Sequence, residues 1–131
     1  MTNLRDVYVR GKYRDVILPM TVIRRLDSLL ESTKEKVLKL KAQLEEAKVT
    51  DIWPALCAAA GYAFCNASPF TLKELAGKTK SQTLESDFIE YLDGFSENVR
   101  EIIDKFKFRN QIPTMSKADI LGAVIGKFMS N

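Results

Sequence analysis

Residues 13–31, YRDVILPMTVIRRLDSLLE, constrain the fold more than any other stretch of the chain. On a helical wheel the apolar side chains cover most of the circumference, which predicts a helix that is buried on most sides. The expected buried positions are Val16, Leu18, Met20, Val22, Ile23, Leu26, Leu29 and Leu30. The expected polar stripe is Arg14, Thr21, Arg25 and Ser28. Pro19 removes a backbone donor, so it either kinks this helix or begins a second one, and the kink is favoured.

The same stretch is not expected to cross a membrane. Arg24, Arg25 and Asp27 would lie inside the span, and the stretch has no uncharged run of about 18 residues. The first residues of the chain carry several charges and lack an apolar core, so no secretion signal is expected. These features predict a cytoplasmic location.

Further segments repeat apolar residues at helical spacing between capping residues and glycines. One helix is expected to follow Thr33 and to end before Thr50. Five more are expected: from Trp53 to Ala60, from Thr71 to Gly77, from Leu84 to Gly94, from Ser96 onward, and from Ser116 onward. No segment alternates with a period of two, and no fixed repeat is visible. The prediction is an all-α fold: a single compact, bundle-like domain of five to seven helices over residues 1–131.

The side-chain inventory argues against an independent small enzyme. The chain has no histidine, the commonest general base and metal ligand, and no recognised cofactor loop. A self-contained hydrolase or zinc enzyme is therefore disfavoured. The two cysteines, Cys57 and Cys65, lie in apolar surroundings and are too few for a disulfide framework. They are interpreted as small buried residues in a reducing compartment.

Basic side chains gather near the start of the long apolar helix. Residues 5–25 hold six basic residues against two acidic ones, although the net charge of the chain is only +3. The candidate contacts with DNA or with a protein partner are Arg10, Lys12, Arg14, Arg24 and Arg25. Guanidinium groups bind phosphate bidentately, which favours a DNA backbone contact. The alternative is structural pairing with Asp15, Asp27 or the acids of residues 84–104, and both interpretations stay open.

Two other motifs favour ordinary structural interpretations. AGKTKS at residues 76–81 resembles the end of a phosphate-binding loop. Such a loop needs another glycine five residues before Gly77, and that position is Leu72. A helix end followed by a basic loop is the better interpretation. Residues 84–104 carry seven acids without a partner constellation, which indicates a solvated acidic face rather than a metal or acid–base site.

Four ordered blocks of sequence resemble one known family. LRDVYVRGKYRDVILPMTVIRRLDSLLE (4–31), FCNASPFTLKELAG (64–77), FIEYLDGFSENVREIIDKFKFRNQI (88–112) and ADILGAVIGKF (118–128) resemble the start of the modification subunit of type I restriction-modification systems. That subunit is an adenine-specific DNA methyltransferase. The blocks span most of the chain, and Cys65 stands where the family pattern suggests an aromatic residue. The resemblance identifies the chain with the N-terminal helical domain of such a subunit.

The resemblance also implies a function. The catalytic domain, with its S-adenosylmethionine site, is expected beyond residue 131, so residues 1–131 alone are expected to carry no catalytic, cofactor or metal site. The whole subunit would flip an adenine out of the duplex and methylate its exocyclic nitrogen. Implied partners are double-stranded DNA, a specificity subunit, a second modification subunit and a restriction subunit. The helical domain would assist DNA clamping and assembly, and the alternative is a protein-interaction module without DNA contact.

Overall fold

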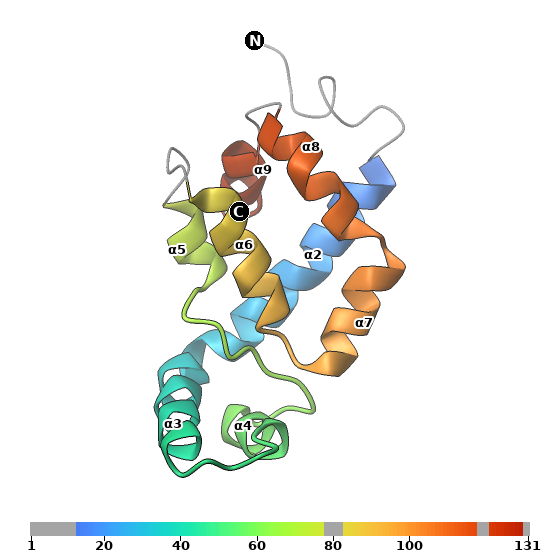
Figure 1. Ribbon diagram of the computed structural model, residues 1–131. Coiled ribbons are helices and arrows are strands. Elements are labelled where there is room, and N and C mark those ends of the chain that lie inside the picture. Colours follow the sequence, from blue (N-terminus) through green and yellow to red (C-terminus); the bar gives the residue numbers. More distant parts are fainter. Residues whose placement is uncertain (1–12, 78–82, 118–120, 130–131) are drawn as a thin grey trace.

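A computed structural model describes residues 13–77, 83–117 and 121–129, and these residues are mainly helical (Figure 1). The α-helices are α2 (Tyr13–Leu30), α3 (Lys34–Glu46), α4 (Trp53–Ala60), α5 (Leu72–Ala76), α6 (Leu84–Asp93), α7 (Glu97–Lys105), α8 (Gln111–Lys117) and α9 (Leu121–Met129). Two single 3-10 turns are η1 (Glu31–Thr33) and η2 (Phe108–Asn110). Within these ranges there is no strand, only one antiparallel bridge between Asn66 and Phe95. The predicted all-α class is confirmed.

Helix α2 runs through the domain and contacts α9 and η2 (Figure 1). Its side chains Met20 and Ile23 are fully buried, as a helix enclosed on several sides requires. The helix continues through Pro19, so the alternative in which this proline begins a second helix is wrong. Among the described helices, none combines the length and the apolar character that crossing a bilayer requires.

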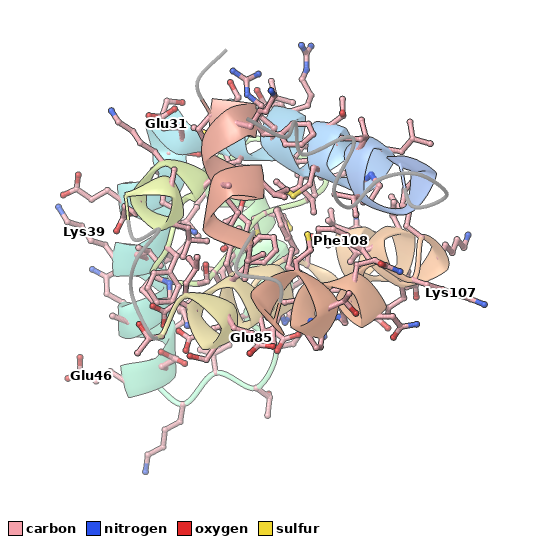
Figure 2. All side chains as sticks on the ribbon, turned by 90° about the horizontal axis from the view of Figure 1, so that it is seen from above. Glu31, Lys39, Glu46, Glu85, Lys107 and Phe108 are labelled. Atoms are coloured by element: carbon pink, nitrogen blue, oxygen red, sulfur yellow. The ribbon has the colours of Figure 1, made fainter. Side chains whose placement is uncertain are left out.

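Aromatic side chains from α6 and its neighbours fill the centre of the core. The ring of Phe88 meets that of Phe108 edge-on, with centroids 6.0 Å apart, and Tyr91 meets Phe95 at 5.2 Å in the same manner. All four residues are fully buried. Phe108 lies between the helices in Figure 2, whereas the adjacent Lys107 extends outward. Edge-to-face pairs of this kind add specificity to the apolar burial.

Most predicted helix ends are confirmed. Helix α4 ends at Gly61, which adopts the left-handed conformation with φ of 83°. Helix α5 begins after Thr71, whose hydroxyl accepts a hydrogen bond from the amide of Glu74 at 3.2 Å. Thr33 occupies the cap position of α3 without a capping hydrogen bond to that helix. Ser96, which precedes α7, also makes no side-chain capping bond to its helix, so local signals locate these helices even where the cap bond is not made.

The prediction that Ser116 begins the last helix is wrong, because this residue lies inside α8 and the last helix begins at Leu121. The proposed cap partner Asp119 lies outside the described residues. Ile112 and Met115 are fully buried and three residues apart, which places both on the inner face of α8. Pro113 lies in the first turn, where a missing amide hydrogen costs no intrahelical bond.

Candidate functional site

The five basic residues proposed from the sequence differ in their surroundings. Arg10 and Lys12 lie outside the described residues, and so does the side chain of Arg14, whose backbone is in the first turn of α2. Arg24 is half-buried, whereas Arg25 is exposed. Positions 14 and 25 are separated by just over three full helical turns, so they lie on one face of α2. The structure thus groups Arg25 with the Arg14 position and turns Arg24 away from them.

The exposed face of α2 forms a continuous strip, called here the α2 stripe. It consists of Leu18, Thr21, Arg25 and Ser28, all of which are exposed. The predicted polar stripe is confirmed for its last three members. The prediction that Leu18 is buried is wrong: its side chain is 48% exposed, because position 18 falls on the same face as Thr21 and Arg25.

Asp27 takes a different role from the arginine pairing considered for it. Its Oδ1 accepts a hydrogen bond from the Tyr91 hydroxyl at 2.8 Å and another from the Leu72 amide at 3.1 Å. Leu72 is the first residue of α5, so the carboxylate also satisfies an amide at a helix N-terminus, where negative charge is favourable. Asp27 is itself buried and joins α2 to α5 and α6.

Two acids of residues 84–104 pair with a cation of their own neighbourhood. Arg109 in η2 contacts the Asp93 carboxylate at 2.6 Å and the Asp104 carboxylate at 3.4 Å. Both carboxylates are more than half exposed, so solvent screens these pairs and each contributes little to stability. The acidic region is therefore partly neutralised where α6, α7 and η2 meet.

A second buried polar group, called here the polar network, consists of Lys34, Asn66, Ser68 and Tyr91. The Lys34 amine donates to Asn66 Oδ1 at 2.8 Å, and the Asn66 amide nitrogen donates to the Tyr91 carbonyl at 2.9 Å. Asn66 Oδ1 also accepts from the Ser68 amide at 2.9 Å and from its hydroxyl at 2.6 Å. One asparagine thereby links α3, the segment before α5, and α6.

The segment holding Asn66 lies against the turn between α6 and α7. The Ala67 amide donates to the Gly94 carbonyl at 2.7 Å, and the Ser96 amide donates to the Cys65 carbonyl at 2.9 Å. A Cβ built on Gly94 would lie 2.6 Å from both the Cβ and the amide nitrogen of Ser68. Only a residue without a side chain permits this approach.

Titration behaviour follows from burial. Desolvation raises the pKa of Asp27 above its usual value, against the opposing effects of its hydrogen bonds and of Lys34. Desolvation lowers the pKa of Lys34 to about 8, although Asp27 and Glu74 favour its charged form. The pKa of the Tyr91 hydroxyl is raised well above its ordinary value by burial and by Asp27. These groups are held by one another in the interior, an arrangement suited to fixing helices rather than to proton transfer with a substrate.

Lys34 makes the stability of the domain depend on pH. The folded-state pKa of about 8 lies below the unfolded value of 10.5, so the unfolded chain binds more protons between these values. The stability difference between wild type and Lys34→Met should therefore shift in favour of wild type as pH rises from about 8 to 10.5. Urea unfolding of both proteins across this range measures the difference. A difference that is flat with pH would contradict the buried position of the amine.

Among residues 13–77, 83–117 and 121–129, no group of three or more histidine, cysteine, aspartate or glutamate residues could hold a metal ion. Between α2 and α7 lies a small apolar gap that has no room for a water molecule and is surrounded by Pro19, Val22, Ile23, Leu26, Val99, Ile102, Ile103 and Phe106. It has no polar lining, so it reflects apolar packing of the two helices against each other.

The sequence contained a usable signal for Asp27. This residue lies four positions after Ile23 and three before Leu30, both on the buried face of α2. An acid at that helical spacing is buried by position and requires hydrogen-bond donors. The polar network had no comparable signal, because Lys34, Asn66 and Tyr91 come together only through the tertiary fold.

The fold and these contacts define the class of the protein: an all-helical domain fixed by buried polar contacts, with an exposed stripe along its longest helix. Residues 1–128 match the model of the family described as HsdM N-terminal domain. The chain therefore belongs to this family and is an N-terminal domain of a type I restriction-modification modification subunit. Comparison with curated proteins and with solved structures gives no match.

Proposed function

We propose that this domain assists DNA clamping and the assembly of the modification subunit with the specificity subunit. The parent subunit would use S-adenosylmethionine to methylate adenine at N6 in double-stranded DNA, in the cytoplasm, with the catalytic groups outside this segment. A second modification subunit and a restriction subunit would complete the assembly. Membership of the HsdM N-terminal domain family supports this context.

The observation that carries the DNA half of the proposal is the position of Arg25. Its guanidinium is exposed on the α2 stripe, on the face that also includes position 14. The neighbour Ser28 is an exposed hydroxyl residue, which can donate to a phosphate oxygen without adding repulsive charge. The Thr21 hydroxyl donates within the helix, to the Ile17 carbonyl at 2.7 Å, so from Thr21 only the oxygen lone pairs face solvent. A DNA backbone lying along this stripe would meet the Arg25 cation and the Ser28 hydroxyl from one helix.

The test is the salt dependence of duplex binding by the assembled enzyme carrying Arg25→Ala. If Arg25 contacts one phosphate, the slope of log affinity against log salt should become shallower by about 0.9. Arg25→Lys keeps the charge and should leave the slope close to wild type. The control is Lys39→Ala, which removes another exposed cation, on α3, where Lys39 extends outward and lies 3.6 Å from the Glu35 carboxylate (Figure 2). Equal slopes for wild type and Arg25→Ala would overturn the DNA contact at this residue.

A second candidate function is supported by the apolar members of the same region. Leu18 on α2 is 48% exposed, and Ile102, on the side of α7 that faces α2, is 44% exposed. Such side chains favour docking of protein rather than DNA. Under this alternative Leu18→Gln weakens association with the specificity subunit, while Arg25→Ala leaves the DNA salt slope unchanged. Under the DNA proposal Arg25→Ala changes the slope whatever the effect of Leu18→Gln.

A further inference from the structure

The two cysteines face each other across the end of α4. The Cys57 thiol donates a hydrogen bond to Cys65 Sγ, and the two sulfur atoms are 3.3 Å apart. Both are free thiols; Cys57 is half-buried and Cys65 is fully buried. A disulfide bond is about 2.05 Å long, so the sulfurs are within roughly 1.3 Å of bonding distance. The sequence had indicated two small buried residues, and the structure places their thiols in contact with each other.

Backbone hydrogen bonds hold both cysteines in this arrangement. The Cys57 carbonyl accepts from the amide of Gly61 at 2.9 Å, where the left-handed glycine turns the chain back toward α4. On the other side, the Cys65 amide donates to the Ser96 hydroxyl at 3.2 Å and its carbonyl accepts from the Ser96 amide at 2.9 Å. The sulfurs are therefore kept close by anchored backbone on each side, and rotation of the side chains can close the remaining gap.

We propose that Cys57 and Cys65 form an oxidative modification site that a peroxide converts to an intramolecular disulfide. The Cys57 sulfur attacks one peroxide oxygen, the O–O bond breaks, and the departing hydroxide takes the thiol proton to give water and a Cys57 sulfenic acid. The Cys65 sulfur then attacks the Cys57 sulfur, and the sulfenic oxygen leaves as a second water with the Cys65 proton. Two thiols and one hydrogen peroxide thus give one disulfide and two waters.

The environments of the two thiols assign their roles. Cys57 is partly accessible from solvent, so a small oxidant reaches it first. Cys65 is fully buried, so its sulfur is shielded from direct contact with an oxidant in solvent. Its distance of 3.3 Å makes it the resolving group for any oxidised Cys57. The resulting bond would fasten α4 to the segment one residue before Asn66 of the polar network.

Mass spectrometry of the purified chain tests the site directly. Trypsin cuts after Lys48 and Lys73, so both cysteines lie in the single peptide of residues 49–73. After treatment with hydrogen peroxide and alkylation of remaining thiols, this peptide should lack two hydrogen atoms and carry no alkyl group. Chymotryptic cleavage between the cysteines, at Tyr62 or Phe64, should leave its two halves joined until a reductant is added.

Two variants separate the roles. Cys57→Ser should leave Cys65 unoxidised after the same treatment, because its sulfur is shielded. Cys65→Ser should allow Cys57 to gain oxygen atoms, since no resolving thiol remains. If the wild-type peptide gains oxygen on Cys57 without losing two hydrogens, or if the chains are joined to one another instead, the proposal is wrong. The wild-type measurement needs no substitution, so it tests disulfide formation even if the Cys65 variant does not fold. Its outcome is independent of the DNA proposal.

Discussion

Gly94→Ala is expected to destabilise the domain by roughly 3 kcal/mol, near the upper end of overpacking effects. The added methyl would lie 2.6 Å from the Cβ and amide nitrogen of Ser68, neither of which is the far end of a flexible side chain. Relieving this clash must separate the α6–α7 turn from the Asn66 segment and break the Ala67-to-Gly94 hydrogen bond. Urea unfolding followed by circular dichroism measures the loss.

Gly126→Ala is the matched control for this substitution. Gly126 lies inside α9, and a Cβ there would meet no heavy atom within 4 Å. Alanine has the higher helix propensity, so this variant should gain roughly 0.5–1 kcal/mol. If both glycine variants changed stability by the same amount and sign, close approach at Gly94 would not be the cause.

Asp27→Ala should cost roughly 3 kcal/mol for a different reason. Truncation removes the acceptor of two buried donors, the Tyr91 hydroxyl and the Leu72 amide. It leaves them unpaired in the interior and also removes the negative charge from the start of α5. Thermal or urea unfolding of the variant near neutral pH measures this cost.

Asp27→Asn separates the hydrogen bonds from the charge. The amide oxygen can accept from both donors, so at neutral pH this variant should lose less stability than Asp27→Ala. The pKa of Asp27 is 3.8 in the unfolded chain and higher in the folded state, so the folded state binds more protons between these two values. Wild type therefore loses stability as pH rises from 3.8 to the folded-state pKa, whereas the asparagine variant does not. The variant should therefore gain relative to wild type over the same interval. An alanine variant as stable as the asparagine one would show that these hydrogen bonds contribute little.

Helix positions could be predicted because their signals are local. Gly61 and Thr71 mark their helix ends through backbone conformation and side-chain capping, which depend on residues a few positions away. α8 was missed because its only strong signal, the spacing of Ile112 and Met115, is short and is interrupted by Pro113. Leu18 was misplaced because its hydrophobicity was taken as evidence of burial, whereas its position on the wheel indicated exposure.

The candidate site was less predictable than the fold. The exposed position of Arg25 was predicted from helical spacing alone, and its contact with DNA stays a prediction. Lys34 looked like one of many helix-surface lysines, yet its amine is largely buried against Asn66. The sulfur contact between Cys57 and Cys65 depends on the turn at Gly61 and on the position of Ser96, which lie outside any local pattern.

The bridge between Asn66 and Phe95 also determines when the chain can complete its fold during synthesis. The Ala67 and Ser96 amides are hydrogen-bonded to carbonyls of the opposite segment, and the partners are about thirty residues apart in the sequence. The segment before α5 therefore lacks its backbone partners until the α6–α7 turn has left the ribosome. The Ala67 and Ser96 amide protons should exchange with solvent slowly, because exchange requires an opening that separates the two segments. Their protection therefore reports whether the Asn66 segment and the α6–α7 turn are paired.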